Sequence, residues 1–269
     1  MVHGCCEVLG SNNSDLCMDN VFISHWMDWP VRGRWPLRAV NAALRLLGTR
    51  LRLRSPYDSG SMTSTEQRMN LFHVVQHVLR SGTPGELVEL GSERGQTAVL
   101  FSKLVSELAP DRRLHLYTIF ENDDALQSLQ QNFRAVGEPL PELHIGLVQQ
   151  TLPRELPQTI AFVHIDLGST VAGDVKALIL HCLQQVYPRL APGGVCVVQD
   201  YCDTSVLDSW NPWPGIKAAC DEFLADKPER MEVMYAGWYS HGCFRKVAGG
   251  GGRTSAVPGV AHQSMEGRA

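Results

Sequence analysis

The sequence predicts a doubly wound α/β fold, with a mostly parallel sheet and an N-terminal helical extension. Between residues 61 and 246, short apolar segments alternate with segments of helical periodicity. Glycine, proline or polar residues stand at most of the changes between them, and such alternation is typical of βαβ units. The 269 residues are 44% hydrophobic and 19% charged, a composition and length that suit one large globular domain with extensions.

The helical extension is expected near residues 36–54. Pro36 can begin a helix, and Leu37, Val40 and Leu44 follow it at spacings of three or four. Seven arginines between positions 32 and 54 make this stretch basic. Basic helices can bind membrane surfaces or anionic partners, but a solvated face of a helix on its own domain is the favoured interpretation.

The expected elements of the main domain follow in order. Ser64 or Thr65 can cap a first helix, which Gly82 and the residues after it would end. Further strands are expected where apolar residues run together, and helices where they recur every three or four positions. We expect helices at 65–80, 96–108, 123–136, 173–190 and 215–226, and strands at 86–90, 114–120, 144–148, 160–165, 194–199, 231–235 and 242–246.

The chain is therefore divided into three parts. Residues 1–60 form a partly helical, basic extension, and residues 61–246 form the α/β domain. The segment 247–269 begins with a glycine run and has no apolar periodicity, so we expect a disordered tail.

Charge and cysteine usage exclude several classes of protein. The net charge of −4 argues against a nucleic-acid partner, and no apolar run approaches the roughly 18 residues of a membrane span. The eight cysteines lack CxxC spacing, and several, such as Cys196, lie in apolar runs where cysteine behaves as a small hydrophobe. The first residues lack a basic-then-apolar signal pattern. We therefore expect a cytoplasmic protein.

A glycine-containing turn follows the first expected strand. It runs Glu89-Leu90-Gly91-Ser92-Glu93-Arg94-Gly95 into a helix, which lets the backbone approach a ligand at the carboxyl edge of a parallel sheet. The two glycines, four apart, do not match the GxGxxG fingerprint of dinucleotide-binding proteins. The pattern fits a nucleoside ligand without pyrophosphate, such as S-adenosylmethionine, although a merely structural turn would also explain it.

Two aspartates end later strands of the same sheet. Asp166 follows the apolar run that ends at Ile165, and Gln199 and Asp200 follow the run that ends at Val198. On adjacent strand ends, these oxygen ligands could share a hard cation such as Mg²⁺. Strand-end aspartates also often cap the following helix, so this alternative stays open.

The ordered set of these motifs resembles the macrocin O-methyltransferase family, whose members methylate sugar hydroxyls of macrolide antibiotics. The resemblance runs from about residue 38 to residue 246, and no single piece of it is decisive. The matching segments are 61–63, 84–91, 94–95, 132–133, 137, 151–153, 164–166, 187–194, 199–201, 215–223 and 242–246.

This resemblance implies a Rossmann-like class I methyltransferase that uses S-adenosylmethionine with assistance from Mg²⁺. It implies that Asp166 and Asp200, with Gln199, hold the metal, and that Asp166 accepts the substrate proton. The acceptor would be the hydroxyl of a sugar or another natural product, and a homo-oligomer formed through the N-terminal region is plausible. The residues that the resemblance places along the cofactor are Ser61, Met62, Glu89, Gly91, Gly95, Thr118, Ile119, Phe120 and Glu121.

The chain departs from the family pattern at two positions. The family has paired acids before Tyr201, whereas the first of them is Gln199 here, and an amide oxygen adds no charge to a metal site. The second strand of the family ends with an acid suited to ribose hydroxyls, whereas this chain offers Thr118. Glu121 or Asp123 could substitute by a less direct geometry.

Three functions therefore remain open from the sequence. The first is a Mg²⁺-assisted small-molecule O-methyltransferase. The second is a metal-independent methyltransferase with Asp166 or His241 as general base. The third is a binding protein that keeps the fold without the chemistry. His73 and His77, one helical turn apart, are at metal-binding spacing, but an ordinary helix face is favoured for them.

Overall fold

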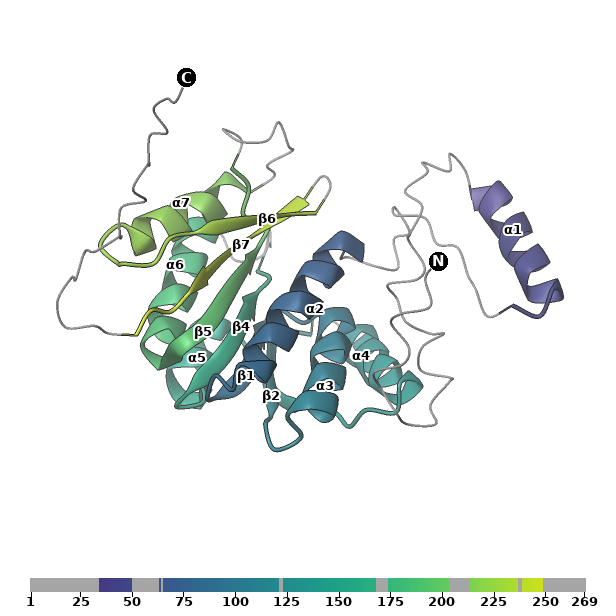
Figure 1. Cartoon of the computed structure of the whole chain (residues 1–269), viewed down its shortest axis with the longest axis horizontal. Coiled ribbons are helices and arrows are strands. Elements are labelled where there is room, and N and C mark those ends of the chain that lie inside the picture. The colour runs from purple at the N-terminus through teal and green to yellow at the C-terminus, as the bar shows by residue number, and fades with distance from the viewer. Residues whose placement is uncertain are drawn as a thin grey trace, which may run out of the picture.

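The computed structural model describes residues 34–49, 63, 65–120, 123–167, 174–203, 213–236 and 239–248. Predictions that concern Ser61, Met62, Glu121 and the tail from residue 249 lie outside the described residues. Figure 1 shows a central sheet flanked by helices, with the first helix standing apart from them.

The sheet has seven strands in the order β3-β2-β1-β4-β5-β7-β6. Strands β1 to β5 are parallel, whereas β7 runs antiparallel to both β5 and β6. The strand order reverses direction between β1 and β4, and this reversal confirms the prediction of a doubly wound α/β fold. The strands are β1 (Glu86–Leu90), β2 (Leu114–Thr118), β3 (Glu142–Ile145), β4 (Ile160–Ile165), β5 (Leu190–Gln199), β6 (Glu232–Ala236) and β7 (Tyr239–Arg245).

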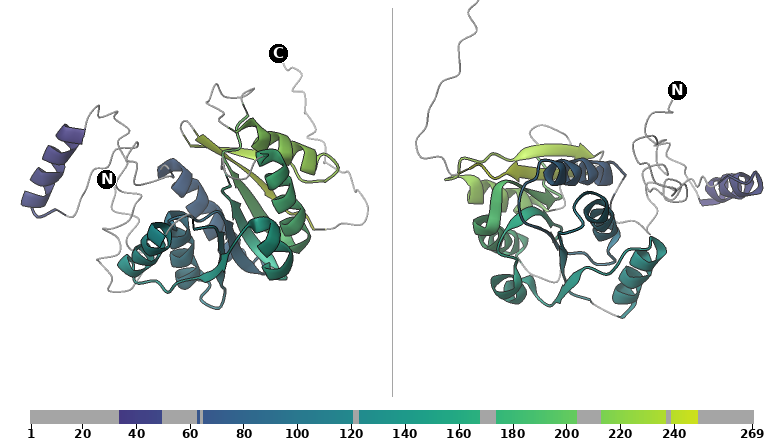
Figure 2. Two further views of the ribbon diagram at one scale, coloured as in Figure 1. Left: turned by 180° about the vertical axis from the view of Figure 1, so that it is seen from behind. Right: turned by 60° about the horizontal axis from the view of Figure 1, so that its bottom comes forward.

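Helices cover both faces of this sheet (Figure 2). Val88 and Leu90 of β1 face one buried cluster, which α5, α6 and α7 complete, while Leu87 faces the other cluster with α2, α3 and α4. Because side chains alternate along a strand, one strand serves both cores. The helices are α1 (Arg34–Leu46), α2 (Thr65–Arg80), α3 (Gln96–Leu108), α4 (Asp123–Ala135), α5 (Val148–Glu155), α6 (Val175–Val186) and α7 (Pro214–Leu224), with a 3₁₀ turn at Tyr187–Arg189.

Local chemistry explains where several helices begin and end. The Asp174 carboxylate accepts hydrogen bonds from the backbone N–H groups of Lys176 and Ala177 at 2.9 and 3.3 Å, and so caps α6. Helix α1 ends at Leu46, eight residues before the predicted end at 54, because Gly48 adopts a left-handed φ of 70°. The N–H groups of Gly48 and Thr49 bond back to Arg45 and Leu44 in a Schellman arrangement.

The structure corrects one stretch of the predicted element order. The strand expected at 144–148 lies at Glu142–Ile145, and the chain then forms α5, which the sequence analysis did not predict. Helix α5 is short and contains Pro153, so its sequence carries little helical signal. Packing supplies the missing stability, since Val148 and Leu152 are buried in the core beneath the sheet.

A close contact at Gly91 brings the ends of β1 and β4 together. A Cβ at this glycine would lie 1.9 Å from the carbonyl oxygen of Asp166, and the Gly91 φ of 93° is in the region that favours glycine. The Asp166 N–H also donates to the Leu90 carbonyl at 2.8 Å. Only a residue without a side chain fits between these two strand ends.

We predict that Gly91→Ala destabilises the protein severely. The clash is with backbone rather than with a flexible side chain, so the loss in unfolding free energy should exceed about 4 kcal/mol or prevent folding. The matched control is Gly82→Ala, because Gly82 has a φ of 68° and nothing lies within 4 Å of its added Cβ. Its replacement should cost only about 1–2 kcal/mol. Denaturant unfolding of both variants checks this, and equal losses would contradict the steric explanation.

Candidate active site

The turn after β1 is organised around the buried carboxylate of Glu89. This side chain has no solvent exposure. Thr97 Oγ1 donates to Glu89 Oε1 at 2.5 Å, Ser92 Oγ donates to Oε2 at 3.0 Å, and His164 Nδ1 lies 3.0 Å from Oε1. Three protein donors therefore satisfy a charge that would otherwise be costly to bury.

Backbone hydrogen bonds then set the path of this turn. Gly91 N–H donates to the Tyr117 carbonyl of β2 at 2.8 Å, and Gly95 N–H donates to the Ser92 carbonyl at 2.6 Å. Gly95, with a φ of 72°, stands at the N-terminus of α3, while Asn132 of α4 donates to the Arg94 carbonyl at 2.9 Å. The predicted glycines thus lie at the carboxyl edge of the sheet, where backbone can approach a ligand.

The two predicted aspartates lie at neighbouring strand ends. Asp166 comes directly after Ile165, the last residue of β4, and Asp200 comes directly after Gln199, the last residue of β5. Asp200 follows with a left-handed φ of 58°. The structure therefore brings together the carboxylates that the sequence analysis expected to share an edge.

Burial and mutual repulsion raise the pKa values of these carboxyl groups. Loss of solvent raises the pKa of Asp166 to about 7; His164 opposes this, and Asp200 and Glu89 add to it. Loss of solvent also raises the pKa of Asp200 to about 6, again opposed by His164. Such perturbed acids at a sheet edge mark a candidate functional site.

The same residues fit a divalent oxygen-bound cation. Two carboxylates would lose their repulsion on binding one, and the buried side chain of Gln199, which interacts with the His164 ring, offers a further oxygen. An amide oxygen is an acceptable ligand for Mg²⁺ or Ca²⁺. The donor set thus suits a hard cation, although it carries one carboxylate fewer than the family pattern.

Sequence reasoning assigned no role to His164, which lies between Glu89 and the aspartates. Its ring is fully buried. Burial lowers the pKa of His164, but the hydrogen bond and charge of Glu89 and the charge of Asp166 outweigh that effect, so the net pKa is raised. A histidine inside the apolar strand β4 (Ile160–Ile165) was the available signal, because a buried charge needs a partner.

Tyr201 holds the segment that carries Asp200. Its hydroxyl donates to Asp221 of α7 at 2.9 Å, and Ser240 Oγ of β7 donates to its carbonyl. The Tyr201 ring occupies the space that a side chain at position 242 would need, since a Cβ on Gly242 would lie 2.6 Å from the ring. These contacts explain how Asp200 is kept in its left-handed conformation.

The remaining predicted residues lie in different settings. Thr118 is buried at the end of β2, and Ile119 and Phe120 follow it at the same edge, with Ile119 48% exposed. His241 of β7 is fully buried, which removes it from contact with a dissolved substrate. His73 and His77 are exposed on α2, as an ordinary helix face requires. The roles assigned to the cofactor residues stay predictions.

Comparison with known proteins relates the chain to enzymes that modify natural products. Residues 88–201 match the family model described as a methyltransferase domain. Mycinamicin III 3''-O-methyltransferase of Micromonospora griseorubida is 26% identical over 198 residues, 63% of this chain and 76% of that protein. The 8-demethyl-8-(2,3-dimethoxy-alpha-L-rhamnosyl)-tetracenomycin-C 4'-O-methyltransferase of Streptomyces olivaceus is 24% identical over 188 residues, 60% of this chain and 69% of that protein.

Solved structures share the fold. The O-methyltransferase NovP superposes with a TM-score of 0.56 at 20% identity, over 77% of this chain and 88% of NovP. TomG of Streptomyces achromogenes, an O-methyltransferase whose structure holds S-adenosylmethionine, superposes with a TM-score of 0.53 at 18% identity, over 79% of this chain and 89% of TomG. These likenesses confirm the predicted Rossmann-like class I fold.

We predict that His241 makes the folded protein sensitive to acid. Burial and the charge of His164 lower the His241 pKa from 6.5 to about 3. Below pH 6.5 the unfolded chain therefore binds a proton at this site that the folded chain refuses, which removes about 1.4 kcal/mol of stability for each pH unit. Urea unfolding of the wild type and of His241→Gln at pH 7 and pH 5 should show the variant losing less stability. A difference between the two proteins that is the same at both pH values would contradict the prediction.

Proposed function

We propose that this chain, a member of the S-adenosylmethionine-dependent O-methyltransferases related to macrocin O-methyltransferase, methylates a sugar hydroxyl of a glycosylated natural product. The observation that carries the proposal is the pair of half-buried carboxyl groups with raised pKa values, Asp166 and Asp200, beside the glycine turn at the carboxyl edge of the sheet. The sugar as acceptor is supported by the names of the two relatives.

The glycine turn supplies the binding surface for the cofactor in this proposal. Gly91 and Gly95 let the turn pack closely against the Asp166 carbonyl and Leu129, and Thr118, Ile119 and Phe120 end the neighbouring strand on the side proposed for the adenosine. The Glu89 carboxylate is already engaged by three donors, so it acts by holding the turn in shape. Ser61, Met62 and Glu121 complete the proposed cofactor contacts.

Asp166 is the proposed general base. S-adenosylmethionine supplies, when bound, a methyl group already activated by its sulfonium sulfur, so the protein has to align an acceptor oxygen and remove its proton. When bound, the cofactor would supply the methyl group that the acceptor oxygen takes from its sulfur, and Asp166 would take the hydroxyl proton. Without a bound cation, a pKa of about 7 suits a base that works near neutral pH, whereas a cation on Asp166 would lower this pKa.

Asp166, Gln199 and Asp200 are the proposed ligands of Mg²⁺. A bound cation lowers the pKa of a coordinated hydroxyl and so eases loss of its proton. His241 is the weaker candidate for the base because its ring is fully buried and its lowered pKa makes it a poor proton acceptor.

The cellular setting and the assembly state are also proposals. Five described cysteines are free and buried, which suits a reducing compartment such as the cytoplasm. None of the described helices has the length and apolar character of a membrane span. Helix α1 exposes Val40 and Leu46, and this apolar surface supports a homo-oligomer formed through the N-terminal region.

Calorimetric titration of S-adenosylmethionine into the purified chain, with Mg²⁺ and with a chelator, tests the function. We expect micromolar binding, and a mass gain of one methyl group when glycosylated macrolides or aromatic polyketides are supplied. Turnover that resists the chelator would remove Mg²⁺ from the mechanism and leave Asp166 as a metal-independent base. Absence of cofactor binding in every condition would leave a binding protein with a methyltransferase fold.

We predict that Asp166→Asn separates binding from chemistry. The amide keeps the size of the carboxyl group but cannot accept the substrate proton, so turnover should fall by about 10²–10⁴-fold. Cofactor affinity should change by less than about threefold, because the turn is held by Glu89 rather than by this side chain. Parallel binding and single-turnover measurements check the split. A loss of affinity equal to the loss of turnover would contradict the role as base.

We predict that Gln199→Glu strengthens the metal site. A third carboxylate adds charge to the ligand set, so Mg²⁺ affinity should rise by roughly tenfold. Gln199→Leu, which keeps similar bulk without an oxygen, is the matched control and should weaken binding. Calorimetric Mg²⁺ titrations of the three proteins check this order. Equal affinities would remove Gln199 from the ligand set.

A further inference from the structure

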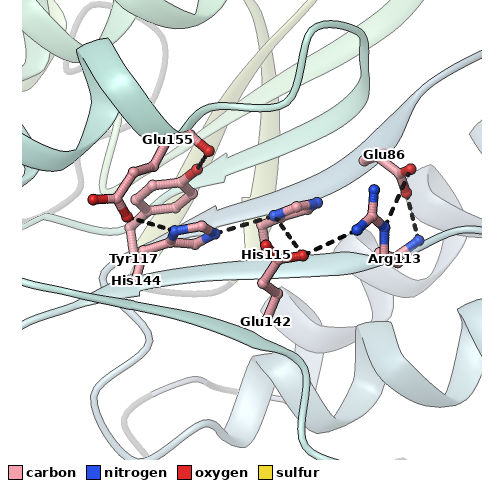
Figure 3. A network of polar contacts seen from close by, with 7 residues as sticks. All are labelled: Glu86, Arg113, His115, Tyr117, Glu142, His144 and Glu155. Carbon is pink, nitrogen blue, oxygen red and sulfur yellow. Dashed lines mark hydrogen bonds and ion pairs between the residues drawn. The ribbon is translucent and has the colours of Figure 1, made fainter.

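A group of polar side chains lies at the edge of the sheet, outside the site described above. Strands β2 and β3 pair in parallel, with His115 opposite Glu142 and Tyr117 opposite His144. Because alternate residues of a strand share a face, all four side chains stand on one face of the sheet. Figure 3 shows them in a line that continues to Glu155 of α5.

Three of these side chains have the arrangement of a metal site. One ligand atom each from His115, Glu142 and His144 lies within 4.8 Å of the other two. His115 Nδ1 is 3.1 Å from His144 Nε2 and 3.6 Å from Glu142 Oε2. Tetrahedral zinc with nitrogen ligands at 2.0–2.1 Å places neighbouring ligand atoms about 3.3 Å apart. The two measured distances lie on either side of that value.

Contacts behind the His144 ring hold it in the orientation that a ligand needs. His144 Nδ1 lies 2.7 Å from Glu155 Oε2, so Nδ1 carries the proton and Nε2 presents its lone pair to His115. The Tyr117 ring stacks on His144 with centroids 4.3 Å apart, and its hydroxyl donates to the Glu155 carbonyl at 2.7 Å. A carboxylate behind a metal-binding histidine is the common arrangement in zinc proteins.

His115 can present a lone pair if it gives up its hydrogen bond to His144, which leaves a buried N–H without an acceptor and must be offset by the bond to the metal. Without a metal, its Nδ1 donates to His144 Nε2. Its other nitrogen, Nε2, is buried and has no hydrogen-bond partner within the described ranges. The proton can therefore move from Nδ1 to Nε2, which frees Nδ1 for a metal.

The charges around the group complement a divalent cation. Glu142, Glu155 and Glu86 bring three carboxylates, and Arg113, which contacts Glu86 and Glu142, brings the one guanidinium of the group in Figure 3. Both histidines are buried, while the Glu142 side chain is 45% exposed, so an ion could enter from its side. Imidazole with carboxylate selects zinc and similar transition metals over Mg²⁺.

We propose that His115, His144 and Glu142 bind a zinc-type divalent metal ion between strands β2 and β3, with solvent as the fourth ligand. The ion would tie edge strand β3 to the body of the sheet. His115 stands three residues before Thr118, about 10 Å along the strand, so this site is separate from the glycine turn and from Asp166 and Asp200.

The test is a zinc titration of the metal-stripped full chain against a chromophoric chelator. It uses an Asp166→Asn/Asp200→Asn background, so that the proposed Mg²⁺ ligands do not contribute. We expect one zinc ion bound with micromolar or tighter affinity, and X-ray absorption of that ion should show two imidazole ligands. His115→Gln/His144→Gln should lose at least 100-fold in affinity, while the matched control His73→Gln/His77→Gln on α2 should bind as before.

Two further variants keep the test decisive if the double histidine variant fails to fold. Glu142→Gln changes a half-exposed ligand and should weaken zinc binding by at least about tenfold, while Glu155→Gln should weaken it by roughly 10–100-fold through the orientation of His144. Absence of saturable zinc binding by the background protein would overturn the proposal. Equal affinity in the background protein and the Glu142→Gln variant would overturn the ligand set.

Discussion

The buried carboxylate of Glu89 is the constraint on which the site depends. A charge without solvent needs donors at fixed positions, and this one draws them from three elements: the turn, α3 and β4. The hydroxyls of Ser92 and Thr97 fix where the turn and the first turn of α3 lie. The ring of His164 ties β1 to β4, the two central strands of the sheet. The contact of Gly91 with Asp166 is possible only because this network holds the strand ends in place.

Much of the fold could be predicted because its signals are local. The strands Glu86–Leu90 and Ile160–Ile165 and the helix Gln96–Leu108 have the predicted bounds. A glycine follows the first strand, an aspartate follows the second, and Pro110 stands two residues after the helix. Helix α5 was missed because its stability comes from packing of Val148 and Leu152 rather than from its own sequence. The end of α1 was misplaced because the left-handed conformation of Gly48 outweighs the apolar residues that follow it.

The residues of the site also fall into two groups: those that a local sequence pattern reveals and those whose role depends on a partner far away in sequence. Asp166, Asp200 and the glycines could be found because parallel strands place their carboxyl ends on one edge, so positions after strands are neighbours in space. His164 was passed over because its importance comes from a partner, Glu89, that lies 75 residues away in sequence. The group around His115 and His144 depends on the register of β2 against β3. A shift of one residue would turn these rings to opposite faces, and the sequence carries no direct signal of that register.

The presence of an amide at Gln199, where the family pattern has an acid, has a physical explanation, although it leaves less negative charge for a cation. The negative charges of Asp200 and Glu89 already raise the pKa of Asp166. A third strand-end carboxylate would increase that repulsion whenever no cation is present. An amide oxygen would offer the proposed cation a ligand without this penalty, so Gln199 would favour the metal-free protein at the expense of metal affinity. The oxygen of Gln199 is buried and makes no hydrogen bond of good geometry among the residues described, but the His164 ring interacts with the Gln199 side chain. The proposed cation, or a donor on a ligand, would compete with that ring for the oxygen.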